Sequence, residues 1–251
     1  MAVRFTIDNR EVSAELGEML IDVALRYGID IPSLCHHEAL DPVGACRVCL
    51  VEVTVGGVTS LTTSCNYPIE ESMTVVSESD RILKNRAMNL ELLLARAPES
   101  ELVRQLAARY GITRPRFGPP SHTPLPNCIL CKLCVRACEH LGNNVLTMVE
   151  RGDKQRVGMA FNEPSENCTG CASCASVCPT RCIFVRDTAA ERTIWGQKLP
   201  FATCNECGGA MMTERQKSKM IAENVLPEDY YDLCESCKQA AAGKRFAGIV
   251  W

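Results

Sequence analysis

The sequence predicts an α+β protein built from small modules that metal sites hold together. Three observations lead to this prediction. The chain of 251 residues contains 17 cysteines, most of them in C-x2-C pairs. Short alternating segments typical of strands are interleaved with segments of helical period. The 46% hydrophobic content suffices for one or two ordinary cores or for several small, metal-braced ones, and the cysteine pattern favours the second arrangement.

The overall composition argues against several classes of function. The formal net charge is −3, so we expect no broad basic surface for nucleic acid or anionic membranes. No apolar run approaches the roughly 18 residues of a spanning helix, and the opening MAVRFTIDNREV is charged and strand-like rather than a signal peptide. We therefore expect a cytoplasmic protein with protein or small redox partners. An odd number of cysteines without an export signal indicates metal binding rather than disulfides.

The N-terminal segment 3–34 predicts strand, turn, strand and helix. VRFTI precedes a polar DNRE turn, and the helix GEMLIDVALRYGI carries apolar residues at helical spacing. These residues are Met19, Leu20, Val23 and Ala24. The segment CLVEVTVGGVTSLTTSC alternates in the manner of a hairpin around Gly56 and Gly57.

Two helices should follow in the stretch between Cys65 and Cys128, which contains no cysteine. Ser79 is a plausible N-cap for a helix to about Arg96. Its expected apolar stripe consists of Ile82, Leu83, Leu90, Leu93 and Leu94. Pro98 interrupts the pattern, and a second helix in ESELVRQLAARY should carry Leu102, Val103, Leu106 and Ala107 on one face. The next segment, GITRPRFGPPSHTPLPN, is proline-rich and predicts a semi-rigid connector over 111–127.

The first cysteine group has the spacing C-x10-C-x2-C-x15-C. Its members are Cys35, Cys46, Cys49 and Cys65. Four thiolates can hold a [2Fe-2S] cluster, and the plant-type pattern also sets a C-x2-C pair among more distant partners, although its first gap is shorter. Gly44 and Ala45 are small enough for backbone N–H groups to approach cluster sulfides. A tetrahedral zinc site is the alternative.

The second and third groups both spell C-x2-C-x2-C-x3-C, the run that ligates [4Fe-4S] clusters. In the two-cluster arrangement the fourth cysteine of each run crosses to the other cluster. One cluster is therefore predicted on Cys128, Cys131, Cys134 and Cys178, and the other on Cys168, Cys171, Cys174 and Cys138. Pro179 follows the second run as usual, whereas Glu139 follows the first. A hairpin is expected around Arg151, Gly152 and Asp153.

The remaining cysteines are Cys182 and a C-terminal group with the spacing C-x2-C-x26-C-x2-C. Cys182 is expected to be a buried spectator thiol, because all eight cubane ligand places are already filled. The C-terminal group consists of Cys204, Cys207, Cys234 and Cys237, and a mostly helical insert separates its two pairs. We expect a structural zinc ion here; a mononuclear iron or a further [4Fe-4S] cluster would use the same ligands.

Residues 1–190 resemble the N-terminal iron–sulfur region of the large peripheral-arm subunit of respiratory complex I. The motifs SLCHHEALDPVGACRVCLVEV, CKLCVRAC, VERGDKQ and CASVCPT carry the resemblance. The same region recurs in diaphorase iron–sulfur subunits of NAD-linked nickel–iron hydrogenases, in iron-only hydrogenases and in NAD-linked formate dehydrogenases. The tail, with PFATCNECGG and DLCESCK, is similar to an extension of ferredoxin-like subunits in some hydrogenase complexes.

The cysteine spacing, the proline-rich connector and the resemblance together divide the chain into four expected parts. They are a β-grasp [2Fe-2S] domain over 1–78, a helical segment and linker over 79–127, a 2[4Fe-4S] ferredoxin-like domain over 128–190, and a zinc-type module with four cysteines over 191–251. Members of this family usually carry a further [4Fe-4S] site, built from one histidine and three cysteines, after a helix end like LLLARAP. Here its four places fall on Ala97, Glu101, Arg104 and Tyr110, so this cluster is expected to be absent. Either the remaining clusters are then close enough for direct transfer, or the [2Fe-2S] centre forms a separate branch.

The resemblance implies an electron-transfer subunit without a catalytic site of its own. It would connect an NAD(P)H-oxidising flavoprotein to another redox subunit, such as a hydrogenase, formate dehydrogenase or ferredoxin, in a complex that could bifurcate electrons. No glycine-rich phosphate loop and no nucleophile–base pair is recognisable in the sequence. The alternatives are a free-standing multi-cluster ferredoxin and a zinc-braced scaffold subunit.

Overall fold

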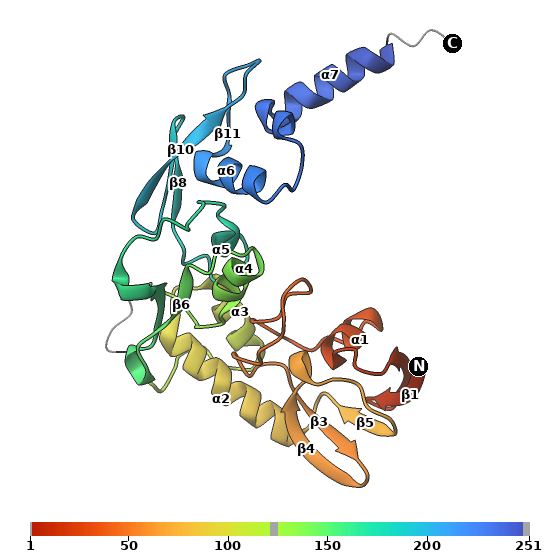
Figure 1. The fold of residues 1–251 in the computed structure, drawn as a ribbon. Helices are drawn as coiled ribbons and strands as arrows, with labels where there is room; N and C mark the ends of the chain where they lie inside the picture. The colour runs from red at the N-terminus through yellow and green to blue at the C-terminus, as the bar shows by residue number, and fades with distance from the viewer. Residues whose placement is uncertain (1, 121–124, 248–251) are drawn as a thin grey trace.

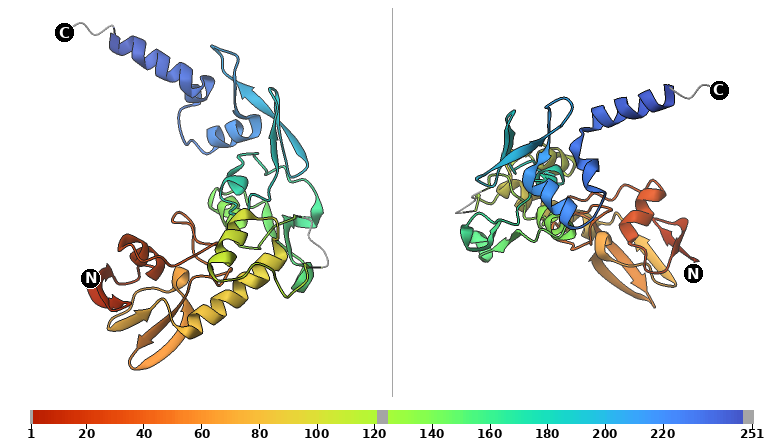
Figure 2. Two further views of the ribbon diagram at one scale, coloured as in Figure 1. Left: turned by 180° about the vertical axis from the view of Figure 1, so that it is seen from behind. Right: turned by 45° about the horizontal axis from the view of Figure 1, so that its top comes forward.

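The computed structural model describes residues 2–120 and 125–247, so part of the proline-rich connector lies outside the described residues. The described chain forms an elongated α+β structure with β1 and α7 at opposite ends (Figures 1 and 2). The long helix α2 runs along the side of the N-terminal sheet toward the central part of the molecule (Figure 1). In the part of the chain that the structure describes, no helix is long and apolar enough to cross a membrane.

The N-terminal part is a five-stranded sheet with the strand order β2-β1-β5-β3-β4. Its elements are β1 (Ala2–Ile7), β2 (Arg10–Glu15), α1 (Leu20–Arg26), β3 (Leu50–Val55), β4 (Val58–Thr63) and β5 (Met73–Val76). The β1–β5 pair is parallel and the other pairs are antiparallel, as in a β-grasp sheet. Leu20, Val23 and Ala24 of α1 are buried, as their spacing predicted. The predicted hairpin is confirmed, because Gly56 and Gly57 join β3 to β4 with φ values of 57° and 80°.

Helices α2 (Asp80–Arg96) and α3 (Glu101–Arg109) confirm the two predicted helices. Ser79 caps α2 by accepting a hydrogen bond from the Ile82 N–H, and Ser100 caps α3 in the same way. Two residues of the predicted apolar faces, Leu83 and Leu102, are 38% and 42% exposed. Each follows or precedes a fully buried residue, and neighbouring positions on a helix point about 100° apart.

The central part contains two short helices and a hairpin. These elements are α4 (Leu133–His140), β6 (Leu146–Val149), β7 (Arg156–Met159) and α5 (Ser173–Ser176). Strands β6 and β7 pair antiparallel and confirm the predicted hairpin. Lys132 and Ala172 precede α4 and α5 in the left-handed conformation, with φ values of 63° and 61°. The two residues occupy equivalent places in the two cysteine runs, so both runs fold into the same local structure.

The C-terminal part begins with a four-stranded sheet that the sequence did not predict. It has the order β11-β10-β9-β8 and continues from Val185 to Thr213, across position 190. The elements are β8 (Val185–Asp187), β9 (Glu191–Ile194), β10 (Gln197–Thr203), β11 (Ala210–Thr213), α6 (Glu214–Ala222) and α7 (Glu235–Ala247). The sheet packs closely on the second cysteine run, because a Cβ added at Gly170 would lie 2.6 Å from the Leu199 Cδ1. Helix α6 and a 3-10 turn over Glu228–Asp232 are the helical segments of the insert between the two C-terminal cysteine pairs, whereas α7 follows Cys234.

Candidate metal centres

The first cysteine group lies at the edge of the β-grasp sheet. Cys35, Cys46 and Cys49 belong to the long connection between α1 and β3, and Cys65 lies in the turn that follows β4. All four side chains are at most 4% exposed. The Cys46 N–H lies 3.5 Å from the Cys35 Sγ and donates to it. The structure therefore brings together the four residues that the sequence predicted as ligands.

The close approach of thiols in this group perturbs their protonation in the cluster-free chain. Hydrogen bonds from the thiols of Cys46 and Cys65, supported by backbone N–H groups, hold the pKa of Cys35 well below its ordinary value. Hydrogen bonds with the thiols of Cys35 and Cys49, followed by burial, raise the pKa of Cys65. Gly44 is required beside this group: its φ is 59°, and a Cβ there would lie 2.9 Å from the Thr63 Oγ1. The loop thus passes too close to the Thr63 and Asn66 side chains for a larger residue at position 44.

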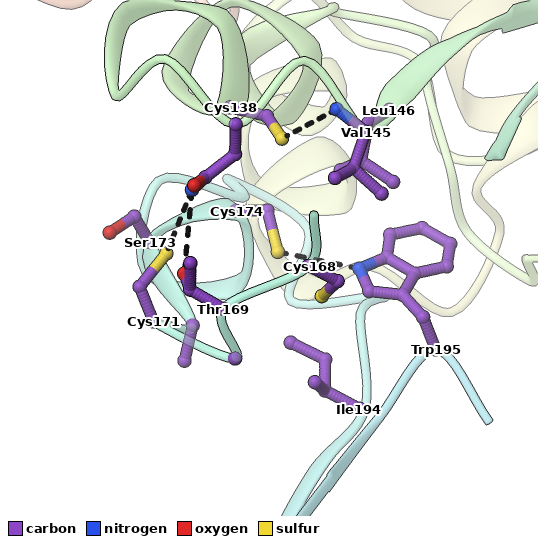
Figure 3. Close-up of a pocket in the computed structure, with 13 residues that line it drawn as sticks. Cys138, Val145, Leu146, Cys168, Thr169, Cys171, Ser173, Cys174, Ile194 and Trp195 are labelled. Atoms are coloured by element: carbon purple, nitrogen blue, oxygen red, sulfur yellow. Dashed lines mark hydrogen bonds between the residues drawn. The ribbon is translucent and has the colours of Figure 1, made fainter. Parts of the chain in front are cut away.

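The two cysteine runs of the central part line two separate cavities. One cavity is lined by Cys128, Cys131, Cys134, Cys178 and Cys182, among other residues. The other is lined by Cys138, Cys168, Cys171 and Cys174 with mostly apolar neighbours (Figure 3). Each cavity takes three cysteines from one run and the fourth from the other run. This grouping is the crossover pattern that the spacing predicted.

The second cavity has three hydrogen-bond donors aimed at sulfur, the longest being the Asn143 Nδ2 at 4.0 Å from the Cys171 Sγ. The Val145 N–H lies 3.3 Å from the Cys138 Sγ, and the Trp195 Nε1 lies 3.4 Å from the Cys174 Sγ (Figure 3). Burial raises the pKa of Cys174 to about 11, while the Trp195 donor opposes the rise. Trp195 lies at the turn between β9 and β10, and the sequence analysis did not identify it. A tryptophan that follows a strand gives no sequence signal for contact with a cysteine of another segment.

Cys182 lies in the first cavity, beside the cysteine that precedes it in the CPTRC motif. Its Sγ is 3.6 Å from the Cys178 Sγ, and its side chain is 6% exposed. The predicted buried position near the candidate clusters is therefore observed. Its role as a spectator remains a prediction.

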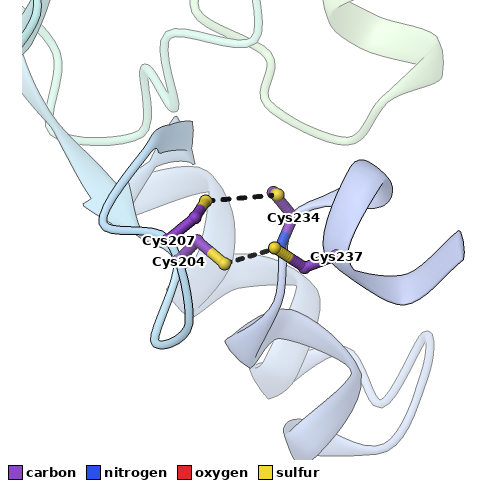
Figure 4. A group of neighbouring side chains, drawn as sticks. All are labelled: Cys204, Cys207, Cys234 and Cys237. Atoms are coloured by element: carbon purple, nitrogen blue, oxygen red, sulfur yellow. Dashed lines mark hydrogen bonds between the residues drawn. The ribbon is translucent and has the colours of Figure 1, made fainter. Parts of the chain in front are cut away.

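The C-terminal group forms a compact set of four thiols between β10 and α7 (Figure 4). All its sulfur atoms lie within 4.8 Å of one another, and those of Cys207 and Cys234 are 3.7 Å apart. Backbone N–H groups of Cys207 and Cys234 lower the pKa of Cys204 to about 6. Among the described residues, no other group of three or more metal-ligating side chains is arranged to hold a single ion.

The four places of the family's additional cluster site are occupied by unrelated groups. Ala97 is fully buried at the end of α2. Glu101 and Arg104 are exposed on α3, where Glu101 accepts a hydrogen bond from Gln105. The Tyr110 hydroxyl accepts a hydrogen bond from the Arg86 Nη1 at 3.0 Å. The described residues at these places therefore form helix and core contacts rather than a set of ligands.

Three observations connect the β-grasp part to the first cavity. Arg136 lies on α4 between Cys134 and Cys138, and its Nη2 donates to the Cys35 carbonyl at 2.6 Å. Burial raises the pKa of Cys131 to about 12, and the negative charges of Cys178 and Cys35 contribute to this rise. Cys35 and Cys131 belong to one continuous apolar cluster. The two candidate sites are thus packed against each other.

Comparison with known proteins identifies both types of domain. Residues 1–80 match the model of a 2Fe-2S iron–sulfur cluster binding domain, and residues 127–182 match that of a 4Fe-4S dicluster domain. The fold and its cysteine loops therefore define a ferredoxin-type iron–sulfur electron-transfer protein. The resemblance to iron–sulfur subunits and the α+β fold class predicted from the sequence are confirmed. The individual ligand assignments remain predictions.

Similar proteins are subunits of larger oxidoreductases. Subunit HndD of the NADP-reducing hydrogenase of Solidesulfovibrio fructosivorans is 35% identical over 70% of this chain and 34% of its own length. The mitochondrial 78 kDa subunit of NADH-ubiquinone oxidoreductase of Neurospora crassa is 31% identical over 78% of this chain and 29% of its own length. This chain spans about a third of the length of these curated relatives.

A solved structure shows the same relationship in three dimensions. A chain of the NAD+-reducing [NiFe]-hydrogenase in the H2-reduced state is 31% identical, with a TM-score of 0.56. The match covers 62% of this chain and 74% of the hydrogenase chain. The chain belongs to the family of iron–sulfur subunits that comprises this hydrogenase chain, HndD and the 78 kDa subunit of NADH-ubiquinone oxidoreductase.

Proposed function

We propose that this chain is an electron-transfer subunit that connects an NAD(P)H-oxidising flavoprotein to a second redox subunit. One [2Fe-2S] and two [4Fe-4S] clusters would supply one-electron redox chemistry, and the chain itself would hold and order them. The observation that carries the proposal is the crossover grouping of the eight cysteines around two cavities. A zinc-braced scaffold does not account for two cavities with crossed cysteine ligands beside the buried cysteine group of the β-grasp part.

The ligand sets follow from the three sites. Cys35, Cys46, Cys49 and Cys65 would hold the [2Fe-2S] cluster. The two cubanes would be held by Cys128, Cys131, Cys134 and Cys178 and by Cys168, Cys171, Cys174 and Cys138. Burial keeps Cys131 and Cys174 protonated in the cluster-free chain, so cluster assembly must displace protons there. Glu101 and Tyr110 hold no fourth cluster in this proposal.

The packing favours direct transfer between the [2Fe-2S] site and the first cubane site over a separate branch. The Arg136 bond to the Cys35 carbonyl and the shared apolar cluster of Cys35 and Cys131 support this arrangement. The family's additional [4Fe-4S] cluster is not needed to connect the β-grasp part to the central part, because the loop of Cys35 already contacts α4. The second cubane site would then be the exit toward the other redox subunit.

The C-terminal cysteines would hold one zinc ion. A tetrahedral site with Zn–S bonds of about 2.3 Å separates neighbouring sulfur atoms by about 3.8 Å. The separation of 3.7 Å between the Cys207 and Cys234 sulfur atoms fits this geometry. A cubane would have to place its four iron atoms between the ligands and would require a wider arrangement. A single iron ion would fit the same four thiols, and metal analysis distinguishes it from zinc.

Anaerobic purification from native cells tests the proposal. We expect about ten iron atoms per chain, two in the [2Fe-2S] site and eight in the cubane sites, with acid-labile sulfide and about one zinc. A flavoprotein should co-purify, and NAD(P)H should reduce the clusters only when it is present. A colourless preparation that contains zinc without iron or sulfide would establish the scaffold instead. A chain that purifies alone and reduces diverse acceptors would establish a free-standing ferredoxin.

A matched pair of variants tests the zinc site. Cys207→Ser should lose about one zinc and keep the iron and sulfide content, because its ligand set is separate from the cubane cavities. Ser218→Ala on the nearby exposed face of α6 is the control and should keep the zinc. Loss of about four iron atoms from Cys207→Ser, with unchanged zinc, would assign a cubane to this group.

A further inference from the structure

Arg86 is a buried arginine at the centre of the contact between α2 and the β-grasp sheet. It is 1% exposed and is the largest of the fully buried side chains among the described residues. Its Nε donates to the Val48 carbonyl at 2.9 Å, and its Nη2 donates to the carbonyls of Leu50 at 2.7 Å and Ser77 at 3.2 Å. The Nη1 donates to the Tyr110 hydroxyl.

All four of these acceptors are electrically neutral. Among the described residues, no carboxylate forms an ion pair with Arg86, although other arginines on the same helix and elsewhere are paired with acids. A buried cation is costly unless a negative charge compensates it. Carbonyl dipoles satisfy the hydrogen-bond donors of the guanidinium, but they do not neutralise its charge. The fold therefore holds a positive charge that no carboxylate of the described residues contacts directly; the Asp8 carboxylate is bonded instead to the N–H and the hydroxyl of Ser77.

The position of Arg86 identifies what can supply this counter-charge. Val48 and Leu50 are the two neighbours of Cys49, which is fully buried. The Val48 carbonyl and the Cys49 N–H belong to the same peptide group, so the Arg86 hydrogen bond polarises that N–H. The guanidinium is thus fixed against both sides of one predicted [2Fe-2S] ligand.

A [2Fe-2S] cluster on four cysteines is an anion. Four thiolates and two sulfides carry eight negative charges against six positive charges from two ferric ions, and reduction by one electron adds a further negative charge. A nearby fixed cation stabilises the reduced state more than the oxidised state, because the reduced state is more negative. Tyr110, which stands at the last place of the family's absent site, supports the guanidinium from the other side.

We propose that Arg86 is the internal counter-charge of the [2Fe-2S] centre and raises its reduction potential as a positioning residue. This inference rests on the proposed assignment of Cys35, Cys46, Cys49 and Cys65 to that cluster. It predicts that the charge of Arg86, rather than the shape of its side chain, determines the shift in the reduction potential of the [2Fe-2S] centre. It also predicts selectivity for one centre, because Arg86 is not among the described residues that line either cubane cavity.

The test is an EPR-monitored redox titration of the intact holoprotein. Arg86→Gln should shift the midpoint of the [2Fe-2S] signal to a more negative potential and leave the cubane signals in place. We expect at least a tenfold lower ratio of reduced to oxidised cluster at a fixed ambient potential, which corresponds to about 59 mV for one electron. Arg86→Lys should remain closer to the wild type. Tyr110→Phe keeps the charge and removes one acceptor, so it should leave the midpoint unchanged.

If Arg86→Gln does not fold, the neutral isostere citrulline at position 86 takes its place, because it preserves the shape and most of the donors. An unchanged [2Fe-2S] midpoint in the neutral variant would overturn the inference. An equal shift in Arg86→Lys or Tyr110→Phe would also overturn it, because packing would then be the cause. Absence of a [2Fe-2S] signal from the wild type would instead overturn the proposed function on which the inference rests.

Discussion

The Arg136 guanidinium donates a hydrogen bond to the Cys35 carbonyl, with the Nη2 2.6 Å from the oxygen. A second donor, Nη1, is bonded to the Asp41 carbonyl of the same loop. The Arg136 side chain is 8% exposed, and α4 carries it between two cysteines of the central part. One side chain thus ties the ligand loop of the β-grasp part to the helix that contributes cysteines to both cubane sites.

Arg136→Gln should loosen this contact. Hydrogen bonds from a charged donor contribute about 1.5–3 kcal/mol each, so losing two should lower the opening free energy of the 36–45 loop by about 3–6 kcal/mol. Amide hydrogen exchange of the holoprotein measures this change directly. Arg4→Gln, at an exposed position of β1, is the control and should leave the loop protected. Unchanged exchange in Arg136→Gln would show that other contacts hold the loop.

Trp195→Phe should affect one cubane only. The substitution keeps an aromatic ring beside the second cavity but removes the N–H that lies 3.4 Å from the Cys174 Sγ. A donor to a ligand sulfur stabilises the more negative, reduced cluster, so its loss should lower the reduction potential by on the order of 1 kcal/mol in redox free energy. Redox titration followed by EPR provides the measurement. Phe161→Leu, which changes a ring that is 91% exposed, should leave every midpoint in place. A shift of both cubanes by the same amount would contradict the assignment.

Cys182→Ser should retain the full iron and sulfide content. The thiol lies 3.6 Å from the Cys178 Sγ, but the first cavity already contains four other cysteines. Cys178→Ser is the matched variant and should lose about four iron atoms. Iron and sulfide analysis of the two anaerobically purified variants decides the matter. The reverse outcome, with iron lost from Cys182→Ser and kept in Cys178→Ser, would exchange the roles of the two residues.

Glu91→Gln should release the start of the proline-rich connector. Glu91 on α2 is 6% exposed and accepts hydrogen bonds from the Nε, Nη2 and backbone N–H of Arg116. We expect faster tryptic cleavage after Arg116, because the glutamine cannot retain a charged pair with the arginine. Glu101→Gln, on the exposed face of α3, should not change the cleavage rate. Equal cleavage in both variants would show that the pair does not restrain the connector.

The same pair predicts a direction for the pH dependence. The Arg116 side chain, followed by its backbone N–H, lowers the pKa of Glu91 from 4.5 to about 2. A carboxyl whose folded-state pKa is lowered contributes stability that is complete above its unfolded pKa and is lost as the pH falls toward the folded value. Protection of the connector should therefore persist at neutral pH and decline between about pH 4.5 and about pH 2, a window that pepsin cleavage can follow. In Glu91→Gln this acid-dependent change should disappear.

The sequence by itself determined the two helices after the first cysteine group, two hairpins and the identity of the candidate metal-binding residues. Ligand spacing marked the four cysteine groups, Gly56 and Gly57 marked a hairpin, and Ser79 marked a helix start. The hairpin and the helix cap arise from residues that interact within a few positions, and each C-x2-C pair lies within a short segment, so a linear pattern records them. The crossover of Cys138 to the other run was also predictable, because the spacing of paired runs fixes it.

Only the tertiary structure decided the surroundings of those residues. Arg136 and Cys35 are 101 positions apart, Arg86 and Val48 are 38 apart, and Trp195 and Cys174 are 21 apart. No periodicity extends over such distances, because the contacts depend on how whole helices and sheets pack together. The exposure of Leu83 and Leu102 has the same origin, since the neighbouring sheet selects which face of an apolar helix is buried. The sequence identifies the cysteines that are candidate ligands. The tertiary packing determines which charged groups, hydrogen-bond donors and neighbouring sites act on their thiols.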